Sequence, residues 1–283
     1  MTGPPGASGA RRTPTALTIA GSDSGGGAGI QADLKAFASC GVHGTSAITA
    51  ITAQNTVAVA AVAEVDPQMV LAQVRAVLSD IGADAVKVGM LGSAAVAAAV
   101  ARALGELPAS TPVVVDPVMV AESGARLIEP DAQHILIEQI LPRATVATPN
   151  LAEARVLAGS QARETEREGE AEDLLRAVLA LGPASVVLTG GHRELAVDMF
   201  LDSRPGSAIV AIAGERHPGG AAHGSGCTHS AVLAAQLALG SDPLEAARIA
   251  RSRAGAAVAS GLRDIGAGAG PVDALGLARL RER

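Results

Sequence analysis

The sequence predicts an α/β fold in which a mainly parallel β-sheet is covered by helices on both faces. Short runs rich in Val, Ile and Thr alternate with alanine-rich segments of helical length, which is the rhythm of repeated βα units. Turns with Gly, Pro or Asn close most of these units. With 283 residues, 48% of them hydrophobic, the chain can bury one large core. We therefore expect a single domain.

The units follow one another from the amino-terminal end. Strands are predicted over residues 16–20, 46–52, 84–90, 112–120, 145–150 and 185–191. The clearest helical segments are Pro67–Asp80, Ser93–Leu104 and Glu166–Leu181. Short apolar strands joined by helices are typical of a parallel sheet that is covered on both sides.

Two regions depart from this rhythm. Residues 57–65 and 195–212 contain consecutive strand-like runs with no helix between them, so hairpins or edge strands are expected there. After Gly224 the pattern predicts helix to near the end of the chain, and Ser241-Asp242-Pro243 is a start signal for the last long helix. The sequence contains no internal repeat of fixed period.

The amino-terminal residues have a composition of their own. Residues 1–14 are rich in Gly, Pro, Ala and Ser and carry two arginines, but lack the apolar run of a secretory signal. We expect a disordered tail over 1–14 and one domain over 15–283.

Composition also bears on the class of function. The formal net charge of −6 leaves no basic surface for a nucleic-acid backbone, and no stretch is apolar enough to predict a membrane span. The two cysteines, Cys40 and Cys227, have neither disulfide nor zinc-site spacing. These features predict a cytoplasmic protein that acts on small molecules, without nucleic acid or membrane as a partner.

A glycine-rich stretch over residues 21–33 follows the first predicted strand and opens a helix. Its GAGIQA pattern at 27–32 matches the dinucleotide fingerprint, which needs an acidic residue roughly 20 positions on. No Asp or Glu occurs over 34–63, so we reject a dinucleotide site. Glycines this dense allow a ligand to approach backbone amides closely; the alternative is a flexible turn without a ligand.

A second glycine-rich stretch, residues 223–230, precedes the apolar helical run AVLAAQLALG. Gly224-Ser225-Gly226 would place unpaired N–H groups at the positive end of a helix, where the charge on a transferring phosphoryl group is stabilised. A thiol at a helix N-terminus has a lowered pKa, so Cys227 is a candidate base. The alternative is a buried core cysteine behind an ordinary glycine turn.

A third stretch, residues 148–153, lies at the end of a predicted strand, where ligands of α/β sheets collect. Asn150 and Glu153 are three apart, so they can share a hydrated Mg²⁺. The same spacing describes a helix N-cap with its capping-box Glu. The residues alone fit both interpretations.

The chain does not have the P-loop of many phosphoryl-transfer enzymes. Its only lysines are Lys35 and Lys87, and no GxxxxGK[ST] motif occurs. Phosphate charge would have to be met by backbone amides, Mg²⁺ and arginine.

Three further motifs join these stretches: QNT at 54–56, VGML at 88–91 and DPVM at 116–119. In their order along the chain, over residues 17–272, the six motifs resemble the bacterial hydroxymethylpyrimidine and phosphomethylpyrimidine kinases of thiamine biosynthesis, in the ribokinase superfamily. The resemblance implies a three-layer α/β/α, ribokinase-like fold, with ATP and Mg²⁺ as cofactors, K⁺ as a further candidate, and a homodimer. It implies phosphorylation of 4-amino-5-hydroxymethyl-2-methylpyrimidine and then of its monophosphate.

The same resemblance implies roles for individual residues. The aminopyrimidine would be hydrogen-bonded by Gln54 in a pocket lined by Gly21, Asp23, Met90 and Val118. The anion hole would be Gly224, Ser225 and Gly226, with Cys227 as the catalytic base. Glu153 and Asn150 would order the waters of Mg²⁺, and the residues facing ATP and its phosphates would be Asp116, Asn150, Thr189 and Gly191.

The sequence also departs from the family pattern. Thr189 stands where relatives generally have Lys, which removes one positive contact to ATP, although its hydroxyl can still hydrogen-bond a phosphate. Ser225 replaces the more usual threonine, a change that an anion hole built from backbone should tolerate. Glu122 stands where relatives often have lysine or threonine. These changes put the affinity for ATP in question more than the type of reaction.

The histidines have no metal-like spacing. His223 and His229 flank the anion hole, and either tune Cys227 or are ordinary polar groups. The others are predicted to be surface or satisfied polar groups: His43, His134, His192 and His217.

Two other functions stay open at this point. A pyridoxal or pyridoxine kinase of the same superfamily would use a similar cysteine and a similar pocket. A ligand-binding regulator without catalysis is suggested by the missing lysine and by Glu122.

Overall fold

The computed structural model describes residues 12–120, 124, 127–160, 169–190 and 196–280. In this part of the chain one sheet has the strand order β3-β2-β1-β4-β5-β6-β7-β8-β9. The strands are β1 (Thr15–Asp23), β2 (His43–Gln54), β3 (Val59–Glu64), β4 (Ala85–Val88), β5 (Val113–Val115), β6 (Val146–Ala147), β7 (Ser185–Leu188), β8 (Val197–Asp202) and β9 (Val210–Ala213).

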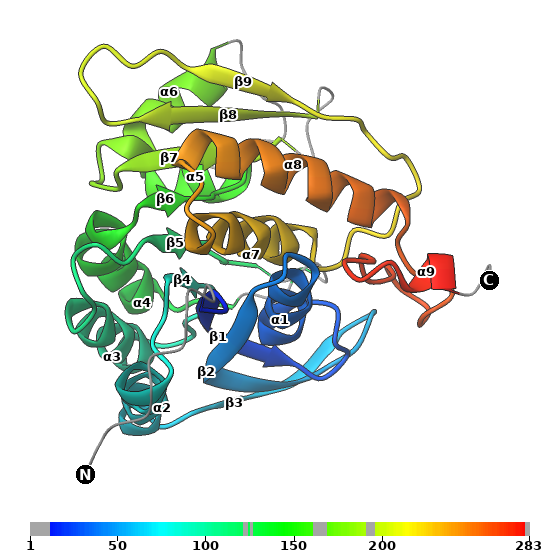
Figure 1. The fold of residues 1–283 in the computed structure, drawn as a ribbon, viewed down its shortest axis with the longest axis horizontal. Coiled ribbons are helices and arrows are strands. Elements are labelled where there is room, and N and C mark those ends of the chain that lie inside the picture. Colours follow the sequence, from blue (N-terminus) through cyan, green and yellow to red (C-terminus); the bar gives the residue numbers. More distant parts are fainter. Residues whose placement is uncertain (1–11, 121–123, 125–126, 161–168, 191–195, 281–283) are drawn as a thin grey trace, which may run out of the picture.

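The helices alternate with the strands along most of the chain (Figure 1). They are α1 (Gly29–Ser39), α2 (Pro67–Asp80), α3 (Ala94–Gly105), α4 (Pro130–Ile135), α5 (Leu151–Leu157), α6 (Glu170–Leu179), α7 (Ser225–Ala238), α8 (Pro243–Ala259) and α9 (Leu277–Leu280). A π-turn at Leu136–Ile140 and a 3₁₀ turn at Leu141–Arg143 extend α4.

The sheet is parallel through its centre and antiparallel towards both edges. β1 pairs in parallel with β2 and β4, and parallel pairing continues to β7. β3 is antiparallel to β2, and β8 and β9 continue the other edge in antiparallel fashion. The hairpins and edge strands predicted for 57–65 and 195–212 are therefore confirmed.

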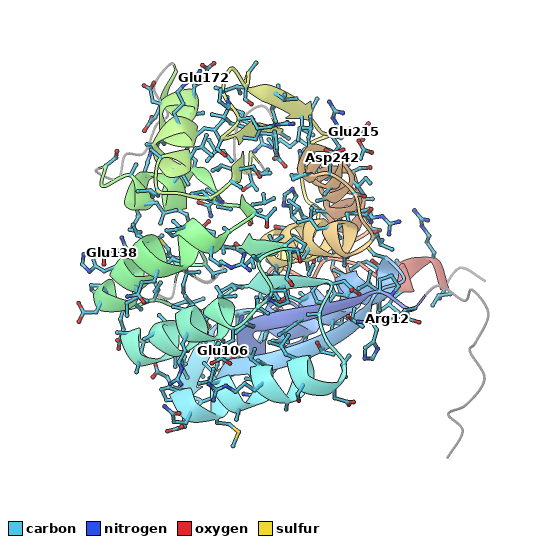
Figure 2. The ribbon with its side chains drawn as sticks, turned by 60° about the vertical axis from the view of Figure 1, so that its left-hand side comes forward. Arg12, Glu106, Glu138, Glu172, Glu215 and Asp242 are labelled. Atoms are coloured by element: carbon cyan, nitrogen blue, oxygen red, sulfur yellow. The ribbon has the colours of Figure 1, made fainter. Side chains whose placement is uncertain are left out.

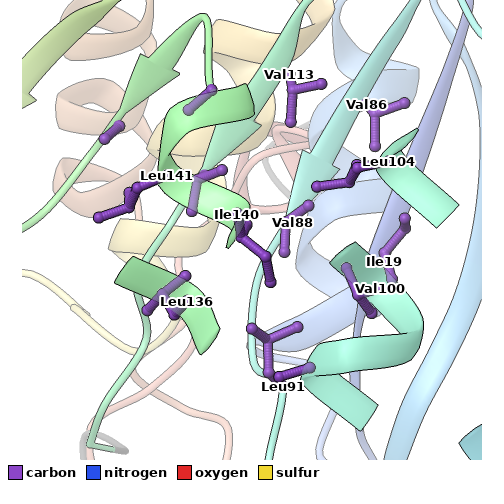
Figure 3. Packing of buried hydrophobic residues seen from close by; sticks show 14 of the residues in the cluster. Ile19, Val86, Val88, Leu91, Val100, Leu104, Val113, Leu136, Ile140 and Leu141 are labelled. Carbon is purple, nitrogen blue, oxygen red and sulfur yellow. The ribbon is translucent and has the colours of Figure 1, made fainter. Parts of the chain in front are cut away.

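Helices cover the sheet on both faces and form two apolar clusters. One cluster buries side chains of α2 to α6, and Figure 3 shows Val100 and Leu104 of α3 packed near Val86 and Val88 of β4. The other cluster buries α1, α7 and α8, with α7 between the sheet and α8 (Figure 1). The three-layer α/β/α prediction is confirmed.

Several predicted boundaries were wrong. The strand predicted over 112–120 has ladder pairing only at Val113–Val115, because the chain turns away from the sheet at Asp116 and Pro117 has no N–H to donate. The predicted helix at the end of the chain stops at Ala259. Repeated glycines in residues 260–276 make helix costly there, and this segment consists mainly of turns and irregular chain.

The predicted amino-terminal tail lies mostly outside the described residues, but its last part is described. Arg12 donates a hydrogen bond to the Ile81 carbonyl at 3.1 Å and lies 3.7 Å from Asp84. Arg12 therefore contacts the domain that is predicted to begin at residue 15.

Most charged side chains lie on the outside of the molecule. Figure 2 labels six of them, among them Arg12, Glu106, Glu138 and Glu215, and these residues are exposed. No helix within the described ranges is both long and apolar enough to cross a membrane. Lys87 is a contrasting case, because its side chain is 0% exposed in the middle of β4.

Candidate active site

One pocket of about 440 Å³ lies at the carboxyl ends of the central strands. The chain goes from β1 to β2 on one side and returns to β4 on the other, so the strand order reverses beside β1, which is where α/β sheets bind ligands. The predicted site residues that line this pocket are Gly21, Asp23, Gln54, Met90, Asp116, Val118, Asn150, Glu153, Thr189, Gly224, Ser225, Gly226 and Cys227. Gly191, together with Glu122 and His192, lies outside the described residues.

The glycine-rich loop after β1 is held by Asp23. This carboxylate accepts hydrogen bonds from the backbone amides of Gly25, Gly27 and Ala28 at 2.8–3.0 Å, and His223 Nε2 lies 3.0 Å away. Burial alone would raise the pKa of Asp23, but the hydrogen bond with His223 and those from the amides hold it below its ordinary value. Asp23 therefore lines the pocket chiefly as the anchor of the loop.

Replacement of Asp23 by asparagine is expected to destabilise the fold by about 3 kcal/mol at pH 7, because an amide NH₂ would face buried N–H donors. The folded-state pKa lies below the ordinary value. The stabilisation is therefore present above the ordinary carboxyl pKa and is lost as the pH falls through the folded pKa. Chemical denaturation at pH 7 and pH 3 should show a smaller difference between variant and wild type at pH 3. The exposed Asp131→Asn is the matched control.

The two glycine-rich stretches touch through their backbones. Gly224 has φ +81°, and a Cβ added to it would lie 1.8 Å from the carbonyl oxygen of Gly27. His223 and Pro271 form a β-bridge, and Gly268 N donates to Thr56 Oγ1 at 3.2 Å. The glycine-rich segment 266–272 therefore links the motif at 54–56 to the start of α7.

The start of α7 faces the pocket, as predicted, but one of its amides is already engaged. Ser225 N donates to the carbonyl of Ala222 at 3.0 Å. The prediction that Ser225 contributes a free amide to the anion hole was therefore wrong. Gly226, which is exposed, and Cys227 follow Ser225 in the first turn of α7, and both line the pocket. The backbone N–H groups of a first helical turn have no partner within the helix.

Cys227 is in the predicted place, but its predicted pKa shift was wrong. Burial raises the pKa of the thiol to about 12, and Asp33 and Asp116 raise it further, while Lys87 and a hydrogen bond from Gly29 lower it. Cys227 is half-buried, and it borders the pocket. Burial and the two carboxylates therefore outweigh the effects of Lys87 and Gly29 on the pKa of the thiol.

A buried charged cluster lies below Cys227. Lys87 Nζ is 3.0 Å from both oxygens of Asp33 on α1 and 3.9 Å from Asp116 Oδ2. Thr18 donates to Asp33 at 2.6 Å, and Ser230 of α7 donates to Asp116 at 2.8 Å. The cluster therefore ties β4 to both helices that follow the glycine-rich stretches.

Asn150 and Glu153 form the capping box that the spacing allowed. Asn150 Oδ1 accepts from Glu153 N, and Glu153 Oε2 accepts from Asn150 N, each at 2.9 Å. Burial, and next the negative charge of Asp116, raise the pKa of Glu153 to about 8, although amides of Asn150 and Met119 oppose the shift. One carboxylate oxygen of Glu153 is thus engaged in the helix cap.

The other end of the pocket is apolar with one amide side chain. Met90 is 9% exposed, and a Cβ on Gly21 would lie 3.0 Å from its sulfur. Gln54 ends β2, where its Oε1 accepts a hydrogen bond from Thr52 at 3.1 Å. Val118 completes this part of the lining. Gln54 therefore offers an amide beside a flat apolar surface.

Sequence reasoning missed several polar residues of the lining. Asp198 is 1% exposed and lies 3.2 Å from His229 Nε2 and 3.8 Å from Arg251 Nε. His223 contacts Asp23, and His229 contacts Asp198. Neither histidine is among the groups that shift the pKa of Cys227. His217, predicted as a surface or satisfied group, also lines the pocket. A lysine within the apolar strand 85–88 was the one local signal available, since a buried charge is rare without a partner.

The predictions for two other histidines agree with the structure. His43 and His134 are both exposed.

Comparison with known proteins decides the family. The family model described as phosphomethylpyrimidine kinase matches residues 23–273. The chain belongs to this family. A hydroxymethylpyrimidine/phosphomethylpyrimidine kinase of Rhizobium meliloti (strain 1021) is 47% identical over 268 residues, which are 92% of this chain and 96% of the relative.

Solved structures of similar kinases have the same fold. The phosphomethylpyrimidine kinase of Clostridium difficile 630 is similar with a TM-score of 0.72 and 37% identity, over 84% of this chain and 96% of that one. The pyridoxal kinase of Bacillus subtilis, solved as an ADP complex, has a TM-score of 0.83 and 36% identity, over 94% of this chain and 99% of that one. The predicted ribokinase-like fold is confirmed.

Proposed function

We propose that the protein transfers the γ-phosphoryl group of ATP to 4-amino-5-hydroxymethyl-2-methylpyrimidine and then to the resulting monophosphate, in thiamine biosynthesis. The observation that carries this proposal is a single pocket that combines the start of α7, Cys227 and Gln54. Membership of the phosphomethylpyrimidine kinase family and the names of its relatives support it.

The acceptor would lie against Met90 and Val118, with its amino group or ring nitrogen hydrogen-bonded by Gln54. In that position the hydroxymethyl oxygen points towards Cys227 and the first turn of α7. Attack on the γ-phosphorus in line needs little covalent chemistry from the protein, so positioning and charge stabilisation are its main contributions. Backbone amides at the start of α7 would stabilise the negative charge of the transferring group.

Cys227 would take the proton of the hydroxymethyl group in the first transfer. A thiol with a pKa of about 12 is rarely ionised near neutral pH, but its thiolate is a strong base. In the second transfer the acceptor is a phosphate that is already largely ionised near neutral pH. One site can therefore serve both steps with different needs for a base.

ATP and Mg²⁺ would bind at the opposite side of the pocket. ATP use is supported by the ADP complex of the similar kinase. Asn150 and Thr189, which form a β-bridge, line the pocket, as does Arg251. In nucleotide-dependent enzymes Mg²⁺ is usually held by one or two carboxylates, waters and the nucleotide phosphates. Glu153 would hold it, Asn150 would act through one of its waters, and the ion would neutralise phosphate charge. K⁺ dependence, a homodimer and a cytoplasmic location remain parts of the proposal.

Gln54→Ala tests the recognition of the acceptor. We expect the KM for the hydroxymethylpyrimidine to rise by roughly 10- to 100-fold, as removal of one or two hydrogen bonds to a buried ligand should cause. The KM for ATP should change by less than about twofold, because Gln54 ends β2, whereas Asn150 and Thr189 follow β6 and β7, several strands away in the sheet. Steady-state kinetics with each substrate varied in turn measure both constants.

Gln68→Ala is the matched control, because Gln68 is exposed on α2 and both constants should stay at wild-type values. An equal rise in the two KM values for Gln54→Ala would contradict the proposed orientation of the acceptor.

A pyridoxal kinase is the second candidate, favoured by the TM-score of 0.83 to the Bacillus subtilis enzyme. An ADP-coupled assay with hydroxymethylpyrimidine, its monophosphate and pyridoxal distinguishes the two functions. We expect turnover of both pyrimidines and weaker turnover of pyridoxal. Turnover of pyridoxal alone would overturn the proposal, and absence of turnover with all three would favour a non-catalytic regulator.

A further inference from the structure

The buried lysine of β4 is the most unusual charged group in the described structure. The Lys87 side chain is 0% exposed, yet it reaches the floor of the pocket. A buried ammonium costs several kcal/mol unless it is paired. Lys87 is paired with Asp33, and it also borders the pocket.

Lys87 is connected to the start of α7 by an unbroken series of contacts. Its Nζ lies 3.9 Å from Asp116 Oδ2, which accepts a hydrogen bond from Ser230 Oγ at 2.8 Å. The same hydroxyl lies within hydrogen-bond distance of the carbonyl oxygens of Gly226 and Cys227, at 3.0 and 3.1 Å. The position of the first turn of α7 is thus coupled to the lysine through Asp116 and Ser230.

The surroundings leave the ammonium little freedom to move. A Cβ on Gly89 would lie 2.9 Å from Lys87 Nζ and 3.0 Å from Ala20 Cβ. On its other side Asp33 is fixed by Thr18 at 2.6 Å. The positive charge is therefore held in one place between α1 and α7, which is the preorganised arrangement that stabilises developing charge without reorganisation.

The charged groups that act on Cys227 come from three elements. Lys87 of β4 is the positive group, while Asp33 of α1 and Asp116 after β5 are negative. Their effects on the thiol oppose one another: the ammonium favours the thiolate, and both carboxylates disfavour it. Glu153 of α5 is a further acidic neighbour of Asp116.

We propose that Lys87 is a positioning residue for phosphoryl transfer, whose fixed ammonium holds Asp116 under α7 and offsets the negative charge that develops beside Cys227. This inference rests on the role proposed above for Cys227. Lys87 supplies part of the positive charge that the P-loop lysine provides in other phosphoryl-transfer enzymes. Lys87 acts through Asp116 and Cys227 and need not contact the substrate.

The test is the rate at which iodoacetamide alkylates Cys227, since only the thiolate reacts. All variants carry Cys40→Ser, which leaves a single thiol. At a fixed pH well below the thiol pKa, Lys87→Met should slow alkylation by roughly tenfold or more, because loss of a nearby opposite charge shifts a pKa by about one unit or more. Asp33→Asn should accelerate alkylation several-fold, because it removes a negative charge while Asp116 keeps the lysine paired.

The two variants are expected to change the alkylation rate in opposite directions, which distinguishes an effect of charge from structural damage. Damage to the network would change the alkylation rate in the same direction in both variants, and that result, or changes of less than about twofold, overturns the proposal. If Lys87→Met does not fold, Lys87→Met/Asp33→Asn replaces it, because both charges are removed together. It should then react roughly tenfold more slowly than Asp33→Asn, and an equal rate would also overturn the proposal.

Turnover distinguishes this inference from the function on which it rests. The kcat for the hydroxymethyl acceptor should follow the alkylation rates across the series, with little change in the KM for ATP. If Cys227→Ala keeps full activity, the proposed base is wrong, whereas the alkylation series still decides whether Lys87 governs the thiol.

Discussion

Cys227→Ala should slow the first phosphoryl transfer by roughly a hundredfold or more, the usual contribution of a positioned general base. The second transfer should lose less than about tenfold, because its acceptor phosphate is already ionised. Separate assays with the hydroxymethylpyrimidine and with its monophosphate measure the two steps. Cys40→Ala is the control, since Cys40 is the other thiol and does not line the pocket.

The pH dependence of the first step should also identify the base. With the thiol pKa raised to about 12, the thiolate fraction increases tenfold for each unit of pH across the neutral and mildly alkaline range. The first-step kcat of the wild type should therefore rise with pH, and that of Cys227→Ala should not. Equal losses in both transfers, together with an unchanged pH profile, would contradict a role as base.

Gly224→Ala should have the second large effect, on both activity and stability. The new Cβ would lie 1.8 Å from the carbonyl oxygen of Gly27, on a residue with φ +81°. Backbone cannot yield as a flexible side chain does, so the two glycine-rich stretches must separate, and the amides at the start of α7 move with them. We expect kcat/KM to fall by roughly 10²-fold or more, the cost of losing one preorganised donor.

Thermal unfolding of the same variant should show a lower Tm, because a non-glycine residue in a left-handed conformation adds about 1–3 kcal/mol of strain. Gly105→Ala, at the end of α3, is the matched control, since its Cβ would meet no atom within 4 Å and its φ is not positive. Normal kcat/KM for Gly224→Ala would show that the amides of α7 do not stabilise the transferring group.

Features of the site that depend on local sequence were predictable. Gly224 and the glycines of residues 21–29 predict tight turns of the backbone, and Asn150 with Glu153 predicts the start of a helix. Each of these signals is contained within a few residues. The parallel orientation of the central strands followed from the alternation of βα units. The hairpins at the sheet edges were predictable because two regions contain consecutive strand-like runs with no helix between them.

Features that depend on the meeting of distant segments were not predictable. The pKa of Cys227 was expected to fall because the sequence shows only its place at a helix start. Asp33 and Asp116, which raise it, approach from other elements. In the same way, Asp198 is found beside His229 and Arg251 only once β8, α7 and α8 pack together. Strand ends were overestimated because the chain leaves the ladder to build the pocket.

The backbone contact between the two glycine-rich stretches has a consequence for biosynthesis of the enzyme. Asp23 and His223 are 200 positions apart, and Thr56 and Gly268 are 212 apart. A nascent chain can pair β1 with β2 early, but Asp23 cannot meet His223 until the last third of the chain is being made. Contacts of such long sequence separation form late and slowly. Catalytic competence should therefore be among the last properties that the folding chain acquires.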